Sequence, residues 1–365
     1  MKNEKFGIKY FYTGLTAFLV IAACVVFFFL MYRLPGIFAF LKKLLGVIEP
    51  VIIGFIIAYL VNPIANAING GLLKLSKKNI KLQNNIYKRV ARGVSVFGAL
   101  AAEMPANYAP EALKCQAIAA RTRAVAQSRA FGGNGCVRHP DCDICTDSAC
   151  CQAYQTDAQL HTRWGSEYVV LRARIDRAVR ATDGLLLTSG GLPIEVLYHA
   201  CSGGKTEDAA AVFASAKPYL VSVDSPGEEG YAGFRADTSF SCEEAADLLL
   251  RAFPGCGVTA DTLPSAIRLQ STTASGRVAT LLVGSQTVRG ADFRKALSLR
   301  STYFTWEADG GSIVFHTVGY GHGVGLSQAG AQAMAADGAD FAEILVHYYP
   351  GTQLTRMDKT GFSGS

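Results

Sequence analysis

Two long apolar runs in the first hundred residues constrain this chain more than any other feature. The first, Leu15–Met31, is interrupted only by Thr16 and is long enough, with its flanks, to cross a bilayer. The second spans residues 45–61, and beyond residue 99 no apolar run reaches the length of about eighteen that a membrane helix needs. We therefore expect a membrane region at 1–97, with one or two transmembrane helices at about 14–33 and 45–62 and a basic tail, followed by a soluble domain.

The basic residues before the first run predict how the chain is oriented. Lys2, Lys5 and Lys9 favour a cytoplasmic N-terminus. The run is long for a cleaved signal peptide and lacks a small-x-small exit, so we expect an uncleaved anchor. The net charge of +6 comes largely from this part of the chain, and no arginine-rich stripe with interleaved aromatic residues appears. We therefore expect no nucleic-acid partner.

Downstream of residue 100, short strands, alanine-rich helices and glycine turns alternate, which predicts an α+β fold. We expect helices at about 109–130, 170–182, 242–253 and 328–349. Leu185–Thr188 and Ile194–His199 should pair as a hairpin that turns at 189–191. Residues 266–289 should form a second hairpin, which turns at 275–276. Residues 354–365 are expected to be a flexible tail.

One carboxyl has the setting of a general acid. Glu103 precedes the first of these helices and is followed by Met104 and Pro105. Apolar neighbours desolvate the charged form and raise the pKa of a carboxyl toward the range that acid catalysis needs. On this segment alone, a helix-capping or surface glutamate is the better interpretation.

A cysteine cluster indicates a metal site or a disulfide knot. Five of the ten cysteines fall within residues 136–151, and His139, Cys145 and Cys151 follow one another at spacings of six. Thiolate and imidazole together suit tetrahedral zinc, and His139 would have no role in a disulfide. The remaining cysteines of the cluster could close the fourth zinc position or pair as disulfides: Cys136, Cys142 and Cys150. Cys242 and Cys256 could also bridge.

Two glycine-rich segments complete the set of motifs. Residues 202–207 place Lys205 beside two glycines but lack the spacing of a P-loop, so we discount nucleotides. The segment 319–325 has a glycine at every second position, which puts His322 on a tight loop. No cysteine or acidic residue neighbours His322 in the sequence, so it is given no metal role.

The motifs follow one order: EMP at 103–105, PEALK-x-QAIAART at 110–122, CQAY at 151–154, SGGKTE at 202–207, PYL-x-SVDS at 218–225 and GYGHGVGLSQAGAQAMA at 319–335. This ordered set, over about residues 100–353, resembles the stage II sporulation protein D (SpoIID)/amidase-enhancer family. Residues 5–97, with IEPVIIGFIIAYLVNPI, resemble the start of an autoinducer exporter-like family of sporulation and other membrane proteins. The chain lacks the further spans of that family, so a transporter is not expected.

The resemblance implies a lytic transglycosylase that cuts the MurNAc–GlcNAc bond of peptide-stripped peptidoglycan glycan strands to 1,6-anhydro products during sporulation. Glu103 would be the catalytic acid/base, and no second carboxylate is needed because the nucleophile is the sugar's own 6-hydroxyl. It also implies zinc on His139, Cys145 and Cys151. The implied substrate-handling residues are Arg121, Tyr198, Ser202, Lys205, Tyr320, His322 and Gln328.

The implied partners are a cell-wall amidase and other sporulation membrane proteins, with a membrane-anchored chain whose catalytic domain lies outside the cytoplasm. The basic segment 74–92 favours the cytoplasmic side and conflicts with this. Three explanations of this conflict are open: the second apolar run does not fully span the membrane, the segment 90–102 crosses it, or two unrelated pieces of sequence meet near 97–102. Such a junction would be a real fusion or a misassembled reading frame. We favour the junction. The alternatives are a non-catalytic amidase enhancer and a transporter fragment with an inactive passenger. Membrane-like sequence replaces the strands that usually lead into EMP and that would support Glu103.

Overall fold

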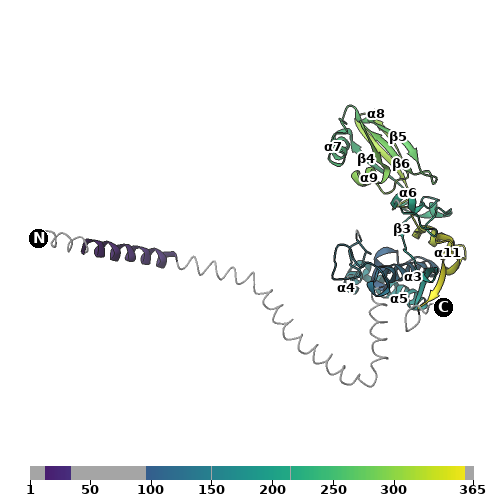
Figure 1. Ribbon diagram of the computed structural model, residues 1–365, viewed down its shortest axis with the longest axis horizontal. Helices are drawn as coiled ribbons and strands as arrows, with labels where there is room; N and C mark the ends of the chain where they lie inside the picture. Colours follow the sequence, from purple (N-terminus) through teal and green to yellow (C-terminus); the bar gives the residue numbers. More distant parts are fainter. Residues whose placement is uncertain (1–12, 34–95, 149, 214, 358–365) are drawn as a thin grey trace, which may run out of the picture. The chain divides into compact units, whose positions relative to one another are not determined.

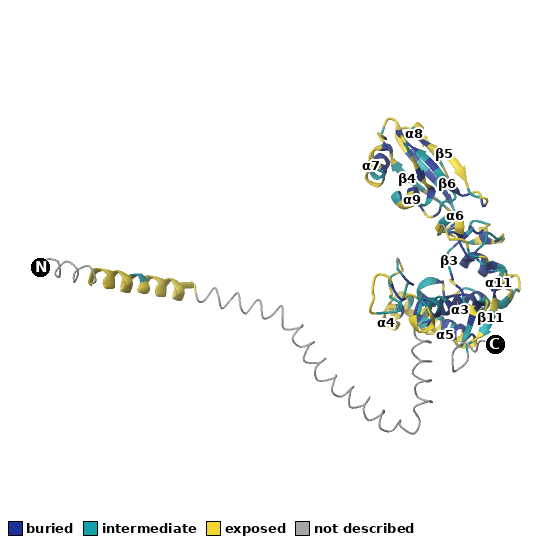
Figure 2. Cartoon of the chain, in the orientation of Figure 1, coloured by how far each residue is buried: buried dark blue, intermediate teal, exposed yellow. Residues whose placement is uncertain are grey.

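The computed structural model describes residues 13–33, 96–148, 150–213 and 215–357 (Figure 1). The chain divides into two units, Met1–Asn84 and Asn85–Ser365. In the first unit, Thr13–Arg33 is a 21-residue helix, long and apolar enough to cross a membrane and exposed nearly throughout (Figure 2). This agrees with the span expected at about 14–33. The span expected at 45–62 and the basic segment 74–92 lie outside the described residues.

The second unit is built around helix α3 (Pro110–Gln127), which is buried on almost every side (Figure 2). Pro110 occupies the first turn, where its missing N–H has no helical partner to lose. Leu113 and Ile118 lie in the largest core cluster, and the small alanine side chains between them allow close neighbours. The elements packed on α3 are α5 (Tyr168–Ala181), α10 (Gln328–Ala336), α11 (Phe341–Tyr348) and β1 (Leu185–Ser189).

Short strands close this core. Strand β1 pairs antiparallel with β2 (Leu192–Pro193) and with β11 (Gln353–Arg356), while β3 (Tyr198–His199) pairs in parallel with β10 (Leu326–Ser327). The first strand and the turn of the expected hairpin are confirmed, but its second strand is Leu192–Pro193 and not 194–199, because Tyr198 and His199 pair with β10 instead. Residues through Arg356 are paired rather than part of a tail. Residues 358–365 lie outside the described part.

A second core lies between two three-stranded sheets, ordered β4-β9-β8 and β5-β6-β7. The rings of Phe293, Phe304 and Phe315 pack together there, with centroids 5.6 to 5.9 Å apart. The hairpin expected at 266–289 is confirmed as β5 and β6, with β7 added. The elements are β4 (Arg235–Ser241), α7 (Cys242–Ala252), β5 (Ile267–Thr272), β6 (Val278–Val283), β7 (Gln286–Arg289), α9 (Gly290–Ala296), β8 (Phe304–Asp309) and β9 (Ser312–Val318).

The helices expected near 109–130, 170–182 and 242–253 are confirmed as α3, α5 and α7. The helix expected at 328–349 is instead two helices, because Gly338 adopts a positive φ of 97° and Asp340 starts α11 with a capping box to Glu343. Three shorter helices were not expected: α4 (Asp157–Trp164), α6 (Ala209–Phe213) and α8 (Leu263–Ala266). The α+β class is confirmed.

Candidate active site and metal centre

Glu103 ends a helical stretch at residues 96–103, and its side chain is half-buried. The segment after the cysteine cluster holds this stretch in place. The Gln155 N–H donates to the Gly98 carbonyl at 3.1 Å. A Cβ on Gly98 would lie only 2.2 Å from the ring of Tyr154, so glycine is required for this contact. The CQAY segment therefore positions the helix end that carries Glu103.

The Glu103 carboxyl meets few hydrogen-bond donors. The Ala153 N–H donates to Oε1 at 2.9 Å, and the Tyr198 hydroxyl also bonds the carboxyl. Burial raises the pKa of Glu103 above its ordinary 4.5, although these bonds and the charge of Arg123 oppose the rise. A carboxyl with a raised pKa keeps its proton to higher pH, which suits a general acid.

Tyr198 lies beside Glu103, on strand β3. Its hydroxyl is 3.1 Å from Gln152 Oε1, and the Gln152 amide nitrogen donates in turn to the Ala120 carbonyl of α3 at 3.3 Å. Burial and the neighbouring Glu103 raise the pKa of Tyr198 well above 10, so the phenol stays protonated and can donate. Of the residues expected to handle substrate, Tyr198 is thus placed directly against the carboxyl.

Arg121 is buried and fully engaged with backbone. Its Nη1 donates to the carbonyls of Thr182 and Leu185 at 2.7 and 3.1 Å, and its Nη2 donates to that of Val179 at 3.3 Å. Burial lowers the pKa of Arg121 to about 10. These carbonyls belong to the end of α5 and the turn into β1. The structure therefore places Arg121 where it joins α3 to α5 rather than where it faces solvent.

Arg123, two residues further along α3, is in a different environment. It is half-buried, and its Nη1 donates to the Val196 carbonyl at 3.3 Å. Its positive charge lowers the pKa values of Glu103 and Tyr198. The sequence analysis did not select Arg123, because only folding brings α3 against the residues that lead into β3.

Glu228 is a second residue that the sequence analysis missed. It is 1% exposed and lies beneath the SGGKTE segment. Burial alone would raise the pKa of Glu228, but the hydrogen bonds that it accepts hold the pKa below 4.5. The donors are the N–H groups of Ser202, Gly203 and Gly204 and the hydroxyls of Ser202, Ser225 and Ser327. Ser202 is consequently a buried support for this carboxylate.

Lys205 and Tyr320 remain open to solvent. The Lys205 ammonium lies 3.8 Å from Asp224 Oδ1, and its side chain is about half exposed. The Tyr320 ring is exposed and lies 5.4 Å from the guanidinium carbon of Arg300. Both positions are accessible to a ligand, but no contact joins either residue to Glu103 in the described part of the chain.

Unlike Lys205 and Tyr320, His322 is half-buried and Gln328 is buried. The His322 ring packs 5.6 Å from His199, and burial with the charges of Arg294 and Arg123 lowers its pKa to about 4. The ring is therefore neutral at pH 7. Gln328 is buried at the start of α10, where its amide nitrogen is 3.3 Å from Gln116 Oε1. It belongs to the core.

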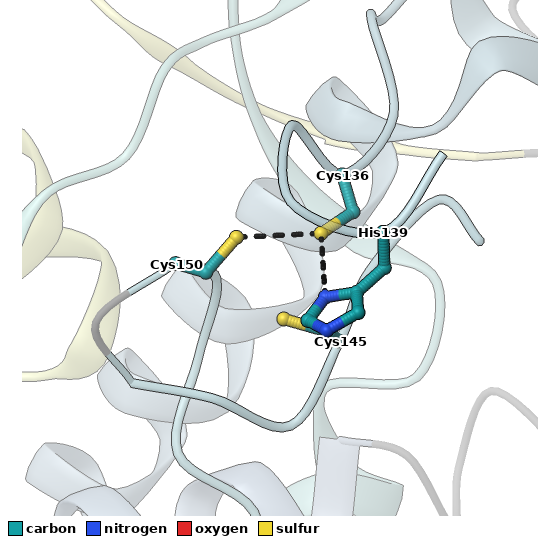
Figure 3. A group of neighbouring side chains, drawn as sticks. All are labelled: Cys136, His139, Cys145 and Cys150. Atoms are coloured by element: carbon teal, nitrogen blue, oxygen red, sulfur yellow. Dashed lines mark hydrogen bonds between the residues drawn. The ribbon is translucent and has the colours of Figure 1, made fainter. Parts of the chain in front are cut away.

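Four side chains of the cysteine cluster converge (Figure 3). The ligand atoms of Cys136, His139, Cys145 and Cys150 all lie within 4.8 Å of one another. Cys136 Sγ is 3.3 Å from Cys150 Sγ and 3.4 Å from His139 Nδ1. Desolvation alone would raise the pKa of Cys136, but its hydrogen bonds with Cys150 and His139 lower the pKa to about 5. Three sulfurs and one imidazole are a donor set that suits a closed structural zinc site.

The structure brings together two of the three residues predicted to bind zinc, His139 and Cys145. Cys151 lies just outside: its Sγ is 3.8 Å from Cys150 Sγ and accepts from the Gln127 amide at 3.1 Å. The group is completed by Cys136 and Cys150, which the spacing of six does not select. All cysteines of the described residues are free thiols, including Cys242 and Cys256.

Comparison with known proteins identifies the family of the chain. Residues 85–188 match the SpoIID family model, described as stage II sporulation protein, so the similarity starts upstream of residue 100, where the ordered motifs begin. Stage II sporulation protein D of Bacillus subtilis is 38% identical over 263 residues, which are 72% of this chain and 74% of that protein.

Two further relatives extend the comparison. The homologue from Bacillus amyloliquefaciens is 37% identical over the same shares of both chains. The amidase enhancer of Bacillus subtilis is 26% identical over 307 residues, 71% of this chain and 40% of that protein. By its matched residues and its shared length with these sporulation proteins, the chain belongs to the SpoIID family.

Proposed function

We propose that the second unit is a lytic transglycosylase that cleaves the MurNAc–GlcNAc bond of peptide-stripped glycan strands. The observation that carries this proposal is the isolated, half-buried Glu103 with its raised pKa. Among the groups of the described residues that shift this pKa, none is a second carboxyl. Asp143 and Asp147 of the cysteine loop are occupied in ion pairs with Arg129 and Arg138.

One carboxyl suffices for this reaction. Protonated Glu103 gives its proton to the glycosidic oxygen, and an oxocarbenium-like transition state develops on the muramic ring. The resulting carboxylate then takes the proton of the muramic 6-hydroxyl as that oxygen bonds to C1 and closes the 1,6-anhydro ring. The nucleophile belongs to the same sugar, so its effective concentration is high. A hydrolase would need a second carboxylate to act on water or on the sugar.

We also propose that Cys136, His139, Cys145 and Cys150 hold one zinc ion. Bound zinc would cross-link the loop at 136–150, as closed structural sites do. The loop leads directly into the CQAY segment, whose Ala153 N–H donates to Glu103. These four residues would therefore act on the reaction indirectly, by fixing the backbone donor that contacts the acid.

We propose the following setting, which the membership of the SpoIID family supports. The helix Thr13–Arg33 would anchor the enzyme in the membrane, with the second unit outside the cytoplasm at the sporulation septum. An amidase would first strip the peptides, and the chain would act with other sporulation membrane proteins. The relative named amidase enhancer supports a second candidate, in which the chain stimulates an amidase without cutting.

One experiment separates the two candidates. The full-length chain in detergent is incubated with peptide-free glycan strands, and the products are read by mass spectrometry beside those of Glu103→Gln. Strands that end in 1,6-anhydro-muramic acid, absent with the variant, would establish the transglycosylase. No products from either protein, with amidase stimulation that survives Glu103→Gln, would establish the enhancer.

A further inference from the structure

A cavity of about 470 Å³ opens beside the C-terminal half of α3. Arg123 and Gln127 of α3 form one wall, the glycine-rich turn at 132–135 forms another, and residues 195–197 form a third. Residue 197 is followed directly by Tyr198, which contacts Glu103. Arg123, in the wall of the cavity, also acts on Glu103 through its charge, so the cavity lies near the proposed acid. It is large enough for a sugar substituent.

Arg123 is the one cation among the residues that line this cavity. A guanidinium carries five N–H donors, and Arg123 uses one of them, on the Val196 carbonyl. Its Nε is buried without a hydrogen-bond partner. Its charge acts on the Glu103 carboxyl, although the two groups form no close ion pair within the described residues. The acidic residue on the same rim, Glu195, lies 3.4 Å from the ammonium of Lys217. Arg123 thus keeps its charge and most of its donors available.

A cation at this position does not stabilise the sugar in the proposed transition state, which carries positive charge on the ring. The Arg123 charge does favour the carboxylate form of Glu103. A guanidinium can in addition bind an anion of the substrate, for which arginine offers two parallel donors. On the sugars of a wall strand, the ionisable group is the lactyl carboxylate of muramic acid. That carboxylate carries charge only when no peptide is joined to it through an amide.

We propose that Arg123 is a specificity-determining residue that binds the free lactyl carboxylate of muramic acid in this cavity. The proposal rests on the function proposed above and adds the group that is recognised. Arg123 therefore favours sugars without a peptide in two ways. The free acid gains a charged hydrogen-bonded pair, and a peptide amide leaves the guanidinium buried without an anion.

The test measures binding of a ligand that has no bond to cleave. The disaccharide GlcNAc–MurNAc lacks the MurNAc–GlcNAc linkage, so its affinity for the full-length chain in detergent can be measured by calorimetry without turnover. The free acid is compared with its lactyl methyl ester, for the wild type, Arg123→Gln and Arg123→Lys. Arg251→Gln is the matched control, because Arg251 is an exposed arginine of α7 that pairs only loosely with Asp247.

We expect the wild type and Arg251→Gln to bind the acid about 10- to 100-fold more tightly than the ester, the range for a charged hydrogen bond. Arg123→Gln should bind both forms equally and should keep the wild-type affinity for the ester, which shows that the site is folded. Arg123→Lys should retain part of the preference. Equal binding of acid and ester by the wild type, no binding of either, or a preference that survives Arg123→Gln would each overturn the proposal.

The two proposals can fail separately. If the disaccharide preference depends on Arg123 but glycan strands yield no anhydro products, the anion site stands and the transglycosylase does not. If Glu103-dependent products form and the acid has no advantage over the ester, the transglycosylase stands and the role of Arg123 does not.

Discussion

Glu103 and Glu228 are two buried or half-buried carboxyls of one unit, and their pKa values shift in opposite directions. Glu103 accepts one backbone N–H and one phenol, and burial raises its pKa. Glu228 is the more deeply buried, yet hydroxyls and N–H groups surround it and hold its pKa below 4.5. The number of donors, and not the depth of burial, therefore decides which carboxyl keeps a proton. The first is suited to chemistry and the second to support.

The largest effect is expected at Glu103. Glu103→Gln keeps the shape of the side chain but can neither give nor take the proton, so cleavage should fall about 100- to 10,000-fold. The free energy of unfolding should change little, because the amide can still accept from the Ala153 N–H. Counting anhydro ends by mass spectrometry and measuring urea unfolding would check both parts. Residual cleavage above a tenth of the wild-type rate would remove Glu103 from the mechanism.

Glu228→Ala, in contrast, should lower the free energy of unfolding. The change leaves the buried hydroxyls of Ser202, Ser225 and Ser327 without their acceptor, so we expect unfolding to become easier by about 3 kcal/mol. Glu229→Ala, at an exposed neighbouring position, is the control and should change stability by less than about 0.5 kcal/mol. Urea unfolding of both variants measures the difference. Equal stability of the two would mean that Glu228 is not a structural carboxylate.

The contrast also depends on the loop that carries the backbone donor to Glu103. Cys136→Ser and Cys150→Ser should each weaken zinc binding by at least about tenfold, whereas Cys142→Ser should not. Cys151→Ser decides between two ligand sets, because spacing includes Cys151 and the observed cluster leaves it out. Metal titration with a competing chelator gives the affinities. Loss of zinc from Cys151→Ser alone would restore the set predicted from spacing.

The smallest effect is the pH dependence of stability. The depressed pKa of Glu228 means that its contribution is present above pH 4.5 and is lost as the pH falls through the lower folded-state value. The raised pKa of Glu103 means that its contribution is present below pH 4.5 and is lost as the pH rises through the higher value. From roughly pH 3 to 7, each unit of pKa shift corresponds to about 1.4 kcal/mol. The stability advantage of the wild type over Glu228→Gln should therefore grow with pH, and its advantage over Glu103→Gln should shrink. Parallel curves for both variants would contradict this.

Local signals made much of the fold predictable. Pro110, in the first turn, marks the start of α3 close to the expected residue 109. The division of 328–349 into two helices was missed because alanine-rich periodicity outweighed a single glycine. Tyr198 was predicted to belong to the site from the order of the motifs, and it does contact Glu103.

Long-range contacts explain what was missed. Arg123 contacts Val196, 73 positions away, and Glu228 contacts Ser327, 99 positions away. No spacing within a single element reports such pairs. Arg121 illustrates the converse, since a residue in a recognisable motif turns out to bond backbone carbonyls in the interior. The cysteine loop adds a local case: its turns bring Cys136 and Cys150 together, although regular spacing favours Cys151.

The position of the last strand has a consequence for how the chain is made. Strand β11 pairs with β1, and Thr188 bonds the Gln353 carbonyl across 165 positions, while α3 packs on α10 and α11. The core around α3 cannot form completely until the last quarter of the chain has been synthesised. Pairings this distant slow folding and leave apolar surface exposed meanwhile. A newly made chain therefore keeps apolar surface of this core exposed until β11 is available, and a chain that ended before Gln353 would lack the strand that pairs with β1.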